Sequence, residues 1–260
     1  MEKLYDLFKR ILGVVLILPP FALAFWLGGI YFKLAIFIAI IILYYEIYRL
    51  VVNRFSLLSF FVGLFAIGLA FWEGGFILSF ILLFIFGIVN YLLGFSVKEA
   101  FILLAVAVYI LVPANIIITL REFSFELCLF VLAVNWSFDT GAYLFGKFSG
   151  RRKIFTRISS GKTLEGLLGG LLTSAIVGGI LGYAFWGFDR LPFYTLSGIY
   201  IGVFAQLGDL VESALKREKG VKDSGKIMPG HGGLFDRVDS LIMSLVGFFL
   251  LFRFFGYIYS

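Results

Sequence analysis

Charged side chains are scarce in this sequence, and several other features are missing as well. Only 15% of the 260 residues are charged and 61% are hydrophobic, whereas about a quarter of the residues of a soluble domain are charged. This composition excludes a soluble globular domain. The only cysteine, Cys128, has no partner for a disulfide, so disulfides contribute nothing to the fold. The chain also contains no internal repeat and no low-complexity segment.

The chain contains several long runs of apolar residues. Each run approaches the roughly 20 residues that a helix needs to cross a hydrocarbon core about 30 Å thick. The runs do not alternate as the strands of a membrane β-barrel do, and backbone amides in lipid are paired within helices. The sequence therefore predicts an all-α integral membrane protein with about nine transmembrane helices. The predicted spans are 11–29, 31–50, 55–72, 74–95, 100–120, 125–146, 164–187, 192–214 and 238–258.

Lysine and arginine are distributed unevenly between the two sides of these spans. With the N-terminus in the cytoplasm, eighteen of the 22 basic residues lie on the cytoplasmic side. This bias follows the positive-inside rule and predicts a multi-pass protein of the inner (cytoplasmic) membrane with an external C-terminus. The basic residues lie in short juxtamembrane loops, so nucleic acid is not an expected partner. The four exceptions are Lys33, Arg121, Arg190 and Arg253.

The first span has a second interpretation as a cleaved signal peptide. Ala22-Leu23-Ala24 is similar to a cleavage site. The apolar run continues past it to Leu27, which favours an uncleaved anchor.

The two halves of the chain differ in character. Residues 1–72 form a predicted N-terminal scaffold, and residues 73–122 add middle helices with a candidate dimer contact. Residues 123–260 carry polar side chains within the spans and are expected to hold the active site, with cytoplasmic loops at 147–163 and 215–237. In the scaffold, Glu46 and Arg49 share one helix face, and we expect them to pair.

Two C-terminal spans have informative patterns. Asn135, Asp139 and Tyr143 recur every four residues and share one face of span six. The glycines of span 164–187 allow close helix approach, which predicts that this span packs in the middle of a bundle.

Five acidic residues of the C-terminal spans form a candidate cluster. Asp209 and Glu212 are three residues apart, Asp236 and Asp239 repeat this spacing, and Asp139 lies on span six. Carboxylates near a low-dielectric boundary repel one another unless a cation compensates. Mg²⁺ commonly binds through one or two carboxylates together with substrate phosphates. The acids therefore predict a divalent-metal site, and pairing of each acid with a nearby lysine or arginine is the alternative.

The loop before the last span combines glycines with basic residues. Gly230, Gly232 and Gly233 surround His231, the only histidine, and lead to a predicted helix start near Asp236. Amides near a helix N-terminus favour phosphate, and basic side chains bind its oxygens. The loop therefore predicts a phosphate site with His231 as a substrate contact, although a solvated connecting loop has the same composition. The basic residues are Lys216, Arg217, Lys222 and Lys226.

The other polar loop is similar to half of a phosphate-binding P-loop at Gly161-Lys162-Thr163. It lacks the leading glycine spacing and the preceding strand, so a Walker A assignment is rejected. Anionic lipid headgroups suit its basic cluster as an alternative target.

Residues 213–239 resemble the signature of the phosphatidate cytidylyltransferases, also called CDP-diacylglycerol synthases. The matching residues are Ser213, Lys216-Arg217, Lys222-Asp223, Gly225, Pro229, His231-Gly232-Gly233, Asp236-Arg237 and Asp239. Met228 stands where the family usually has Leu, Ile or Phe. Two further segments resemble family motifs, Asp139–Tyr143 with Gly146-Lys147, and Ser159–Gly166. In the second segment, Ser160 and Gly161 replace a proline and a lysine.

The resemblance implies a membrane-embedded, homodimeric enzyme of phospholipid biosynthesis. The implied reaction transfers a cytidylyl group from CTP to phosphatidate and depends on Mg²⁺, with the number of ions left open. It implies metal ligands at Asp209 and Asp236, with Glu212 and Asp239 as further ligands. The implied catalytic residues are Asp209, Asp236, Lys222, Asp223, His231 and Asp239. The implied substrate-binding residues are Lys162, Thr163, Ser213, Lys216, Arg217, Gly232, Gly233, Arg237 and Asp139.

Three other functions compete with this one. A CDP-alcohol phosphotransferase requires the string Asp-x-x-Asp-Gly-x-x-Ala-Arg, which is absent. A lipid-alcohol kinase of the dolichol kinase type is similar in this region and would release CDP rather than pyrophosphate. A transporter or channel suits intramembrane acids and glycine-rich helices, but transporters often contain an internal repeat, and here the polar residues gather at one face.

Overall fold

The structure of the protein is a computed structural model, which describes residues 18–52, 55–69, 75–225, 227 and 232–255. These residues are helical apart from turns, one short 3-10 segment and an isolated bridge between Lys153 and Thr163. The all-α prediction is therefore confirmed. Five residues of the predicted phosphate loop lie outside the described residues, namely Lys226, Met228, Pro229, Gly230 and His231.

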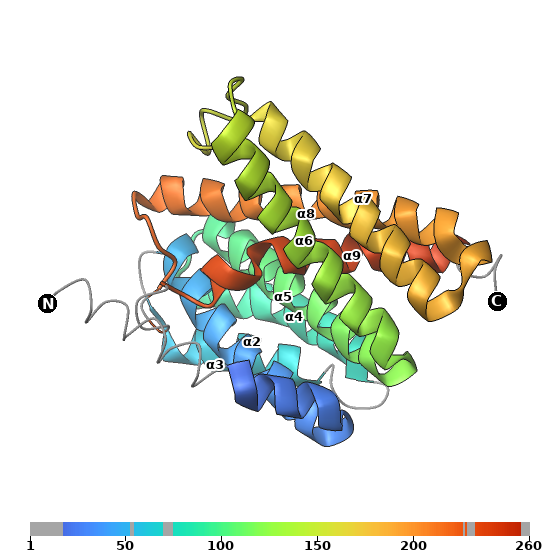
Figure 1. The fold of residues 1–260 in the computed structure, drawn as a ribbon. Coiled ribbons are helices and arrows are strands. Elements are labelled where there is room, and N and C mark those ends of the chain that lie inside the picture. Colours follow the sequence, from blue (N-terminus) through green and yellow to red (C-terminus); the bar gives the residue numbers. More distant parts are fainter. Residues whose placement is uncertain (1–17, 53–54, 70–74, 226, 228–231, 256–260) are drawn as a thin grey trace, which may run out of the picture. The chain divides into compact units, whose positions relative to one another are not determined.

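The described part of the chain contains nine α-helices. Six of them are long and apolar enough to cross a membrane. The first is Leu18–Leu27. The others are α2 (Gly29–Val51), α3 (Leu57–Leu69), α4 (Gly75–Leu92), α5 (Val97–Phe123), α6 (Phe125–Ser149), α7 (Leu164–Trp186), α8 (Leu191–Lys219) and α9 (Phe235–Phe255), with the 3-10 segment η1 (Phe188–Arg190) before α8 (Figure 1). The six are α2 and α5 to α9. The structure thus supports a multi-pass membrane protein, and the count of nine crossings stays a prediction.

The chain divides into two compact units. The N-terminal unit consists of Met1–Ile118 and Glu218–Arg237, and the C-terminal unit consists of Thr119–Arg217 and Val238–Ser260. The loop after α8 therefore belongs to the same unit as α2, α3 and α4. The predicted functional division at residues 72 and 122 stays a prediction.

The N-terminal unit is held together by aromatic packing and by a buried polar chain. The Tyr48 hydroxyl donates to Ser59 Oγ at 3.1 Å, Ser59 Oγ donates to the Asn90 side-chain oxygen, and the Asn90 amide donates to the Phe86 carbonyl at 2.8 Å. Such bonds between apolar helices satisfy polar groups that lipid cannot.

The expected pairing of Glu46 with Arg49 in this unit is wrong. Arg49 donates to the Tyr45 hydroxyl at 3.2 Å. Glu46 is buried and accepts hydrogen bonds from the loop before α9. The reason is that the Leu234 and Phe235 amides donate to the Glu46 carboxylate. Spacing along α2 does not reveal these contacts.

In the C-terminal unit, glycines allow α7 to approach both of its neighbours. Figure 1 shows α6 and α7 running side by side. A Cβ at Gly170 would lie 2.8 Å from the Phe138 ring of α6, and one at Gly178 would lie 2.6 Å from the Tyr194 carbonyl oxygen of α8. Close approach is therefore confirmed. A central position for α7 is wrong, because its other face leaves a row of apolar side chains exposed, as is normal for a helix that faces lipid. The row consists of Leu168, Leu172, Ile176 and Ile180.

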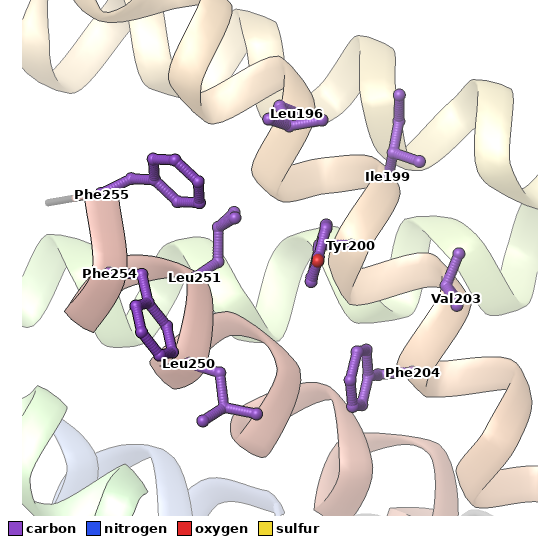
Figure 2. A pocket seen from close by; sticks show the side chains of 9 residues that line it. All are labelled: Leu196, Ile199, Tyr200, Val203, Phe204, Leu250, Leu251, Phe254 and Phe255. Carbon is purple, nitrogen blue, oxygen red and sulfur yellow. The ribbon is translucent and has the colours of Figure 1, made fainter.

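An apolar groove of about 510 Å³ lies between α8 and the end of α9. Figure 2 shows Tyr200 and Phe204 of α8 across from Leu251 and Phe254 of α9. Its lining contains no acidic or basic side chain. This groove is therefore suited to contact with hydrocarbon and not to phosphate chemistry.

Substitution of Gly198 by alanine is expected to destabilise the C-terminal unit. A Cβ at this position would collide with the Ser174 carbonyl of α7 and lie 3.1 Å from Ala175 Cα. Overpacking of this kind costs about 1–3 kcal/mol, which lowers the melting temperature by about 2–4 °C per kcal/mol. Thermal unfolding in detergent measures the change. The matched control is Gly87→Ala in α4, where a Cβ meets nothing within 4 Å; equal melting temperatures for the two variants would contradict the packing argument.

Candidate active site

Three carboxylates come together where α8 and α9 pass each other in the C-terminal unit. Asp209 and Glu212 of α8 and Asp239 of α9 each offer an oxygen atom, and these atoms all lie within 4.8 Å of one another. We call these three residues the acidic cluster. Gly208 makes the crossing possible, since a Cβ there would meet the Asp239 carbonyl and lie 3.1 Å from Ser240 Cα.

Two lysines face the acidic cluster. Lys162 Nζ pairs with Asp209 Oδ2, and Lys216 Nζ lies 2.8 Å from Glu212 Oε2. At separations of no more than 4.8 Å and an effective dielectric constant of about 20, each pair of ionised carboxylates repels by at least about 3.5 kcal/mol. The two ammonium groups therefore stabilise the cluster, and three ionised acids would still exceed them by one charge.

Asp139 of α6 is held next to α9 by a chain of hydroxyl and amide groups. Ser240 Oγ donates to Asp139 Oδ2 at 2.9 Å, and Asn135 donates to Ser240 Oγ at 3.1 Å and to Asp139 Oδ2 at 3.3 Å. Ser244 Oγ donates in turn to the Asn135 side-chain oxygen at 2.6 Å. The predicted shared face of Asn135 and Asp139 is confirmed. Tyr143, at 62% exposure, does not join this chain.

A short hairpin between α6 and α7 places Lys162. The backbone of Ile154 donates to the Lys162 carbonyl at 2.9 Å, and Leu164 donates to the Arg152 carbonyl at 2.8 Å. At its base, Glu165 accepts from the amides of Arg151 and Arg152 at 3.0 and 3.1 Å. These bonds fix the backbone on both sides of Lys162. The hairpin therefore sets the position from which the Lys162 side chain extends toward Asp209.

Thr163, a predicted substrate contact, has a structural partner. Its hydroxyl accepts from the Gly166 amide at 3.1 Å and caps the N-terminus of α7. Substitution of such a cap by alanine typically costs about 0.5–2 kcal/mol. A role in the fold is therefore shown for this residue, and its contact with substrate stays a prediction.

The predicted loop 215–237 begins later than expected, because α8 continues to Lys219. Lys216 and Arg217 are therefore helical. Lys216 meets Glu212 one turn away, and Arg217 Nε donates to the Ile158 carbonyl of the hairpin at 3.4 Å. Ser213 Oγ donates to Asp209 Oδ1 at 3.3 Å. Pairing with acids and with the hairpin explains the longer helix, which hydropathy alone ended at residue 214.

Asp236 holds the start of α9 within the N-terminal unit. Its Oδ2 accepts from the Gly233 amide at 2.8 Å and from the Ser224 amide and hydroxyl, both at 3.0 Å. Gly232 has a φ of +85°, and a Cβ there would lie 2.6 Å from Asp236 Oδ2. Three other predicted residues, Lys222, Asp223 and Arg237, are exposed. His231 lies outside the described residues.

Glu46 is the residue that sequence reasoning missed. It accepts from the Leu234 amide at 3.1 Å and the Phe235 amide at 2.9 Å, so an acid of the presumed scaffold contacts the signature segment. A signal was present, since an acidic residue within a long apolar span is costly and marks a function. This signal was missed because spacing alone favours Arg49, three residues away on the same helix, as the partner of Glu46.

The fold and the site together define a multi-pass membrane protein with acids and lysines collected at helix ends. A sequence profile described as the cytidylyltransferase family matches residues 8–255, and the chain belongs to that family.

Individual relatives agree with this assignment. Over 147 residues the chain is 43% identical to a phosphatidate cytidylyltransferase of Staphylococcus haemolyticus (strain JCSC1435), covering 56% of each chain. It is 43% identical over 148 residues to a phosphatidate cytidylyltransferase of Staphylococcus aureus (strain COL), again covering 56% of each. It is also 49% identical over 128 residues to the uncharacterized protein YnbB of Escherichia coli (strain K12), covering 49% of this chain and 43% of that protein. The match thus spans about half the length of these relatives.

Replacement of Ser240 by alanine is expected to lower stability by about 1–3 kcal/mol. The change removes the donor to Asp139 and the acceptor of Asn135, and buried polar groups that lose a partner carry a cost of this size. The matched control is Ser197→Ala, because this equally buried hydroxyl donates only within its own helix, to the Phe193 carbonyl at 2.8 Å. Thermal unfolding in detergent compares the two variants. A Ser240 variant as stable as the control would show that the hydrogen bonds of Ser240 to Asp139 and Asn135 do not stabilise the fold.

Proposed function

We propose that the protein transfers a cytidylyl group from CTP to phosphatidate and forms CDP-diacylglycerol and pyrophosphate. The observation that carries the proposal is the acidic cluster with its two lysines, in a chain of the cytidylyltransferase family. The 43% identity to phosphatidate cytidylyltransferases supports this choice of substrates.

The proposed reaction brings two anions together. A phosphate oxygen of phosphatidate attacks the α-phosphorus of CTP, the bond to the oxygen that bridges to the β-phosphorus breaks, and pyrophosphate leaves. A phosphomonoester, with a second pKa of about 6, is mostly a dianion at neutral pH, so it needs no general base. Positioning and charge neutralisation should therefore dominate catalysis.

Basic side chains of the site are suited to hold the phosphates. Lys162 and Lys216 already face carboxylates, and an ammonium on a flexible stem can exchange one anion for another. Arg217, Lys222 and Arg237 extend the basic set along the signature segment. Substrate binding by these residues, by Ser213 and by the loop with Asp223 and His231 rests on the family resemblance.

Gln206 adds a donor inside the C-terminal unit. Its side-chain nitrogen is buried and has no hydrogen-bond partner among the described residues. It precedes Asp209 by one turn of α8. An unsatisfied buried donor costs about 1–3 kcal/mol, and a substrate oxygen would remove that cost.

The acidic cluster fits Mg²⁺ by its chemistry. All of its donors are carboxylate oxygens, which suit this hard cation. The three oxygens lie within 4.8 Å of one another, so small side-chain movements would let them share one ion, with waters or phosphate oxygens as its other ligands. We propose Asp209 as a ligand with Glu212 and Asp239 as further ligands, and the family signature adds Asp236. When bound, Mg²⁺ would supply positive charge to the phosphates.

The basic residues also support an orientation for the chain. With the nine predicted spans, eighteen of the 22 would lie on the side of the two polar loops, which favours a cytoplasmic location for those loops and the N-terminus. CTP is soluble, and this orientation would give it access to the site. A homodimer is proposed from the family resemblance alone.

The reaction is tested with purified, detergent-solubilised protein, CTP, phosphatidate and Mg²⁺. We expect equimolar CDP-diacylglycerol and pyrophosphate, and loss of both on chelation, because the charge of the site would be uncompensated. CDP without pyrophosphate would identify a lipid kinase instead. No turnover by protein that retains its melting transition would overturn the proposal, and substrate-independent ion flux in proteoliposomes would then favour a transporter.

Substitution of a proposed metal ligand is expected to abolish most activity. Asp209→Asn and Asp236→Asn should each lower kcat/KM at least about 100-fold, the scale of losing one preorganised electrostatic contact with a transition state. Asp189→Asn is the matched control, because Asp189 is an exposed acid on η1. Initial rates over a Mg²⁺ titration give the measurement. Full activity of either variant with an unchanged Mg²⁺ dependence would remove that residue from the metal site.

A further inference from the structure

Glu46 of α2 is a buried acid whose two carboxylate oxygens are both occupied by the loop before α9. It is 2% exposed. The Leu234 amide donates to Oε1 at 3.1 Å, the Phe235 amide donates to Oε2 at 2.9 Å, and the Ser224 hydroxyl lies 3.3 Å from Oε2. All of these groups belong to the N-terminal unit. One side chain thus contacts both ends of the segment 224–235.

The two amides are the ones that a helix leaves without partners. Leu234 directly precedes α9 and Phe235 is its first residue, and the first N–H groups of a helix have no acceptor within it. The positive end of the helix dipole also favours an anion at this point. Glu46 therefore caps α9 from a different helix, and an apolar side chain at position 46 would leave these donors unsatisfied.

Asp236, the residue that directly follows this segment, also accepts hydrogen bonds from it. Both carboxylates contact Ser224, since its hydroxyl lies 3.0 Å from Asp236 Oδ2 and 3.3 Å from Glu46 Oε2. The Gly233 amide donates to Asp236, while the next two amides donate to Glu46. The position of Asp236 is therefore coupled to Glu46 through consecutive peptide groups.

Two glycines of the signature make room for the Glu46 carboxylate. A Cβ at Gly225 would collide with Oε1 and lie 2.9 Å from Cδ, and a Cβ at Gly233 would lie 2.6 Å from Oε2. These glycines thus serve an internal contact as well as any approach of substrate.

We infer that Glu46 is a positioning residue for the proposed cytidylyl transfer. It fixes Ser224, Leu234 and Phe235 and so holds Asp236 in the arrangement that the substrates require. This role rests on the proposed function, and it assigns part of the active-site support to a helix in the half of the chain that composition marks as scaffold.

The test compares Glu46→Gln with wild-type full-length protein in detergent. The substitution keeps the shape and one acceptor, but it turns an amide N–H toward backbone donors. We expect amide hydrogen exchange of Leu234 and Phe235 to accelerate at least about tenfold. We also expect kcat to fall about 10–100-fold, the range for losing a residue that orients a metal-site group, with KM for CTP changed less than about twofold.

Two further variants separate positioning from general loss of stability. Ser59→Ala is the matched control, because Ser59 is a buried polar residue of the same unit whose side chain bonds Tyr48 and Asn90 and not the loop before α9. It should lower the melting temperature without faster exchange at Leu234 and Phe235 and without a specific fall in kcat. Ser224→Ala removes one contact of each carboxylate and should shift exchange and kcat in the direction of Glu46→Gln, by less.

Three results would overturn the inference. They are unchanged exchange in Glu46→Gln, faster exchange with an unchanged kcat, and equal effects of Glu46→Gln and Ser59→Ala at equal melting temperature. If the wild-type protein shows no CTP turnover, the proposed function fails. The exchange measurement then still shows whether Glu46 holds the loop, so the two failures are distinguishable.

Discussion

The close crossing of α8 and α9 at Gly208 is the constraint on which the acidic cluster depends. With any larger residue at this position, a side chain would meet the backbone of Asp239 and Ser240. The two helices would then separate, and Asp209 and Glu212 on one helix would move away from Asp239 on the other. The serine and asparagine chain joins α6 to α9 by hydrogen bonds of 2.6–3.3 Å, and its Ser244 hydroxyl also lies 3.2 Å from the Ile201 carbonyl oxygen of α8. Packing by a residue without a side chain thus sets the electrostatics of the site.

Hydropathy predicted most of the helices, because a backbone that crosses lipid must pair its own polar groups and is therefore helical. The apolar runs at 125–146 and 164–187 correspond to helices Phe125–Ser149 and Leu164–Trp186, since a buried backbone in hydrocarbon must be helical. The same signal failed where polar contacts extend a helix. α8 continues past residue 214 to Lys219 because Lys216 and Arg217 find partners in Glu212 and the hairpin.

The candidate site was predictable in its residue types and less so in its partners. Spacing along α8 placed Asp209 and Glu212 on one face, and the acidic cluster contains both. Spacing cannot show that Glu46 bonds a residue 189 positions away, as it does with Phe235. Hydropathy also placed the start of the basic loop at residue 215, whereas α8 continues to Lys219. Contacts distant in sequence carry no periodicity, so they become visible only when the chain is folded.

The carboxylates of this protein fall into two kinds, which differ in what holds them. Glu46 and Asp236 accept mainly from backbone amides and a serine hydroxyl, donors that are fixed by the chain and cannot leave without unfolding it locally. Asp209 and Glu212 instead face the ammonium groups of Lys162 and Lys216, which sit at the end of flexible side chains. A fixed donor makes an acid a structural anchor, whereas a movable cation can be exchanged for a metal ion or can follow a phosphate group. By this criterion the acidic cluster is suited to exchanging its cations, whereas Glu46 holds Leu234 and Phe235 in place.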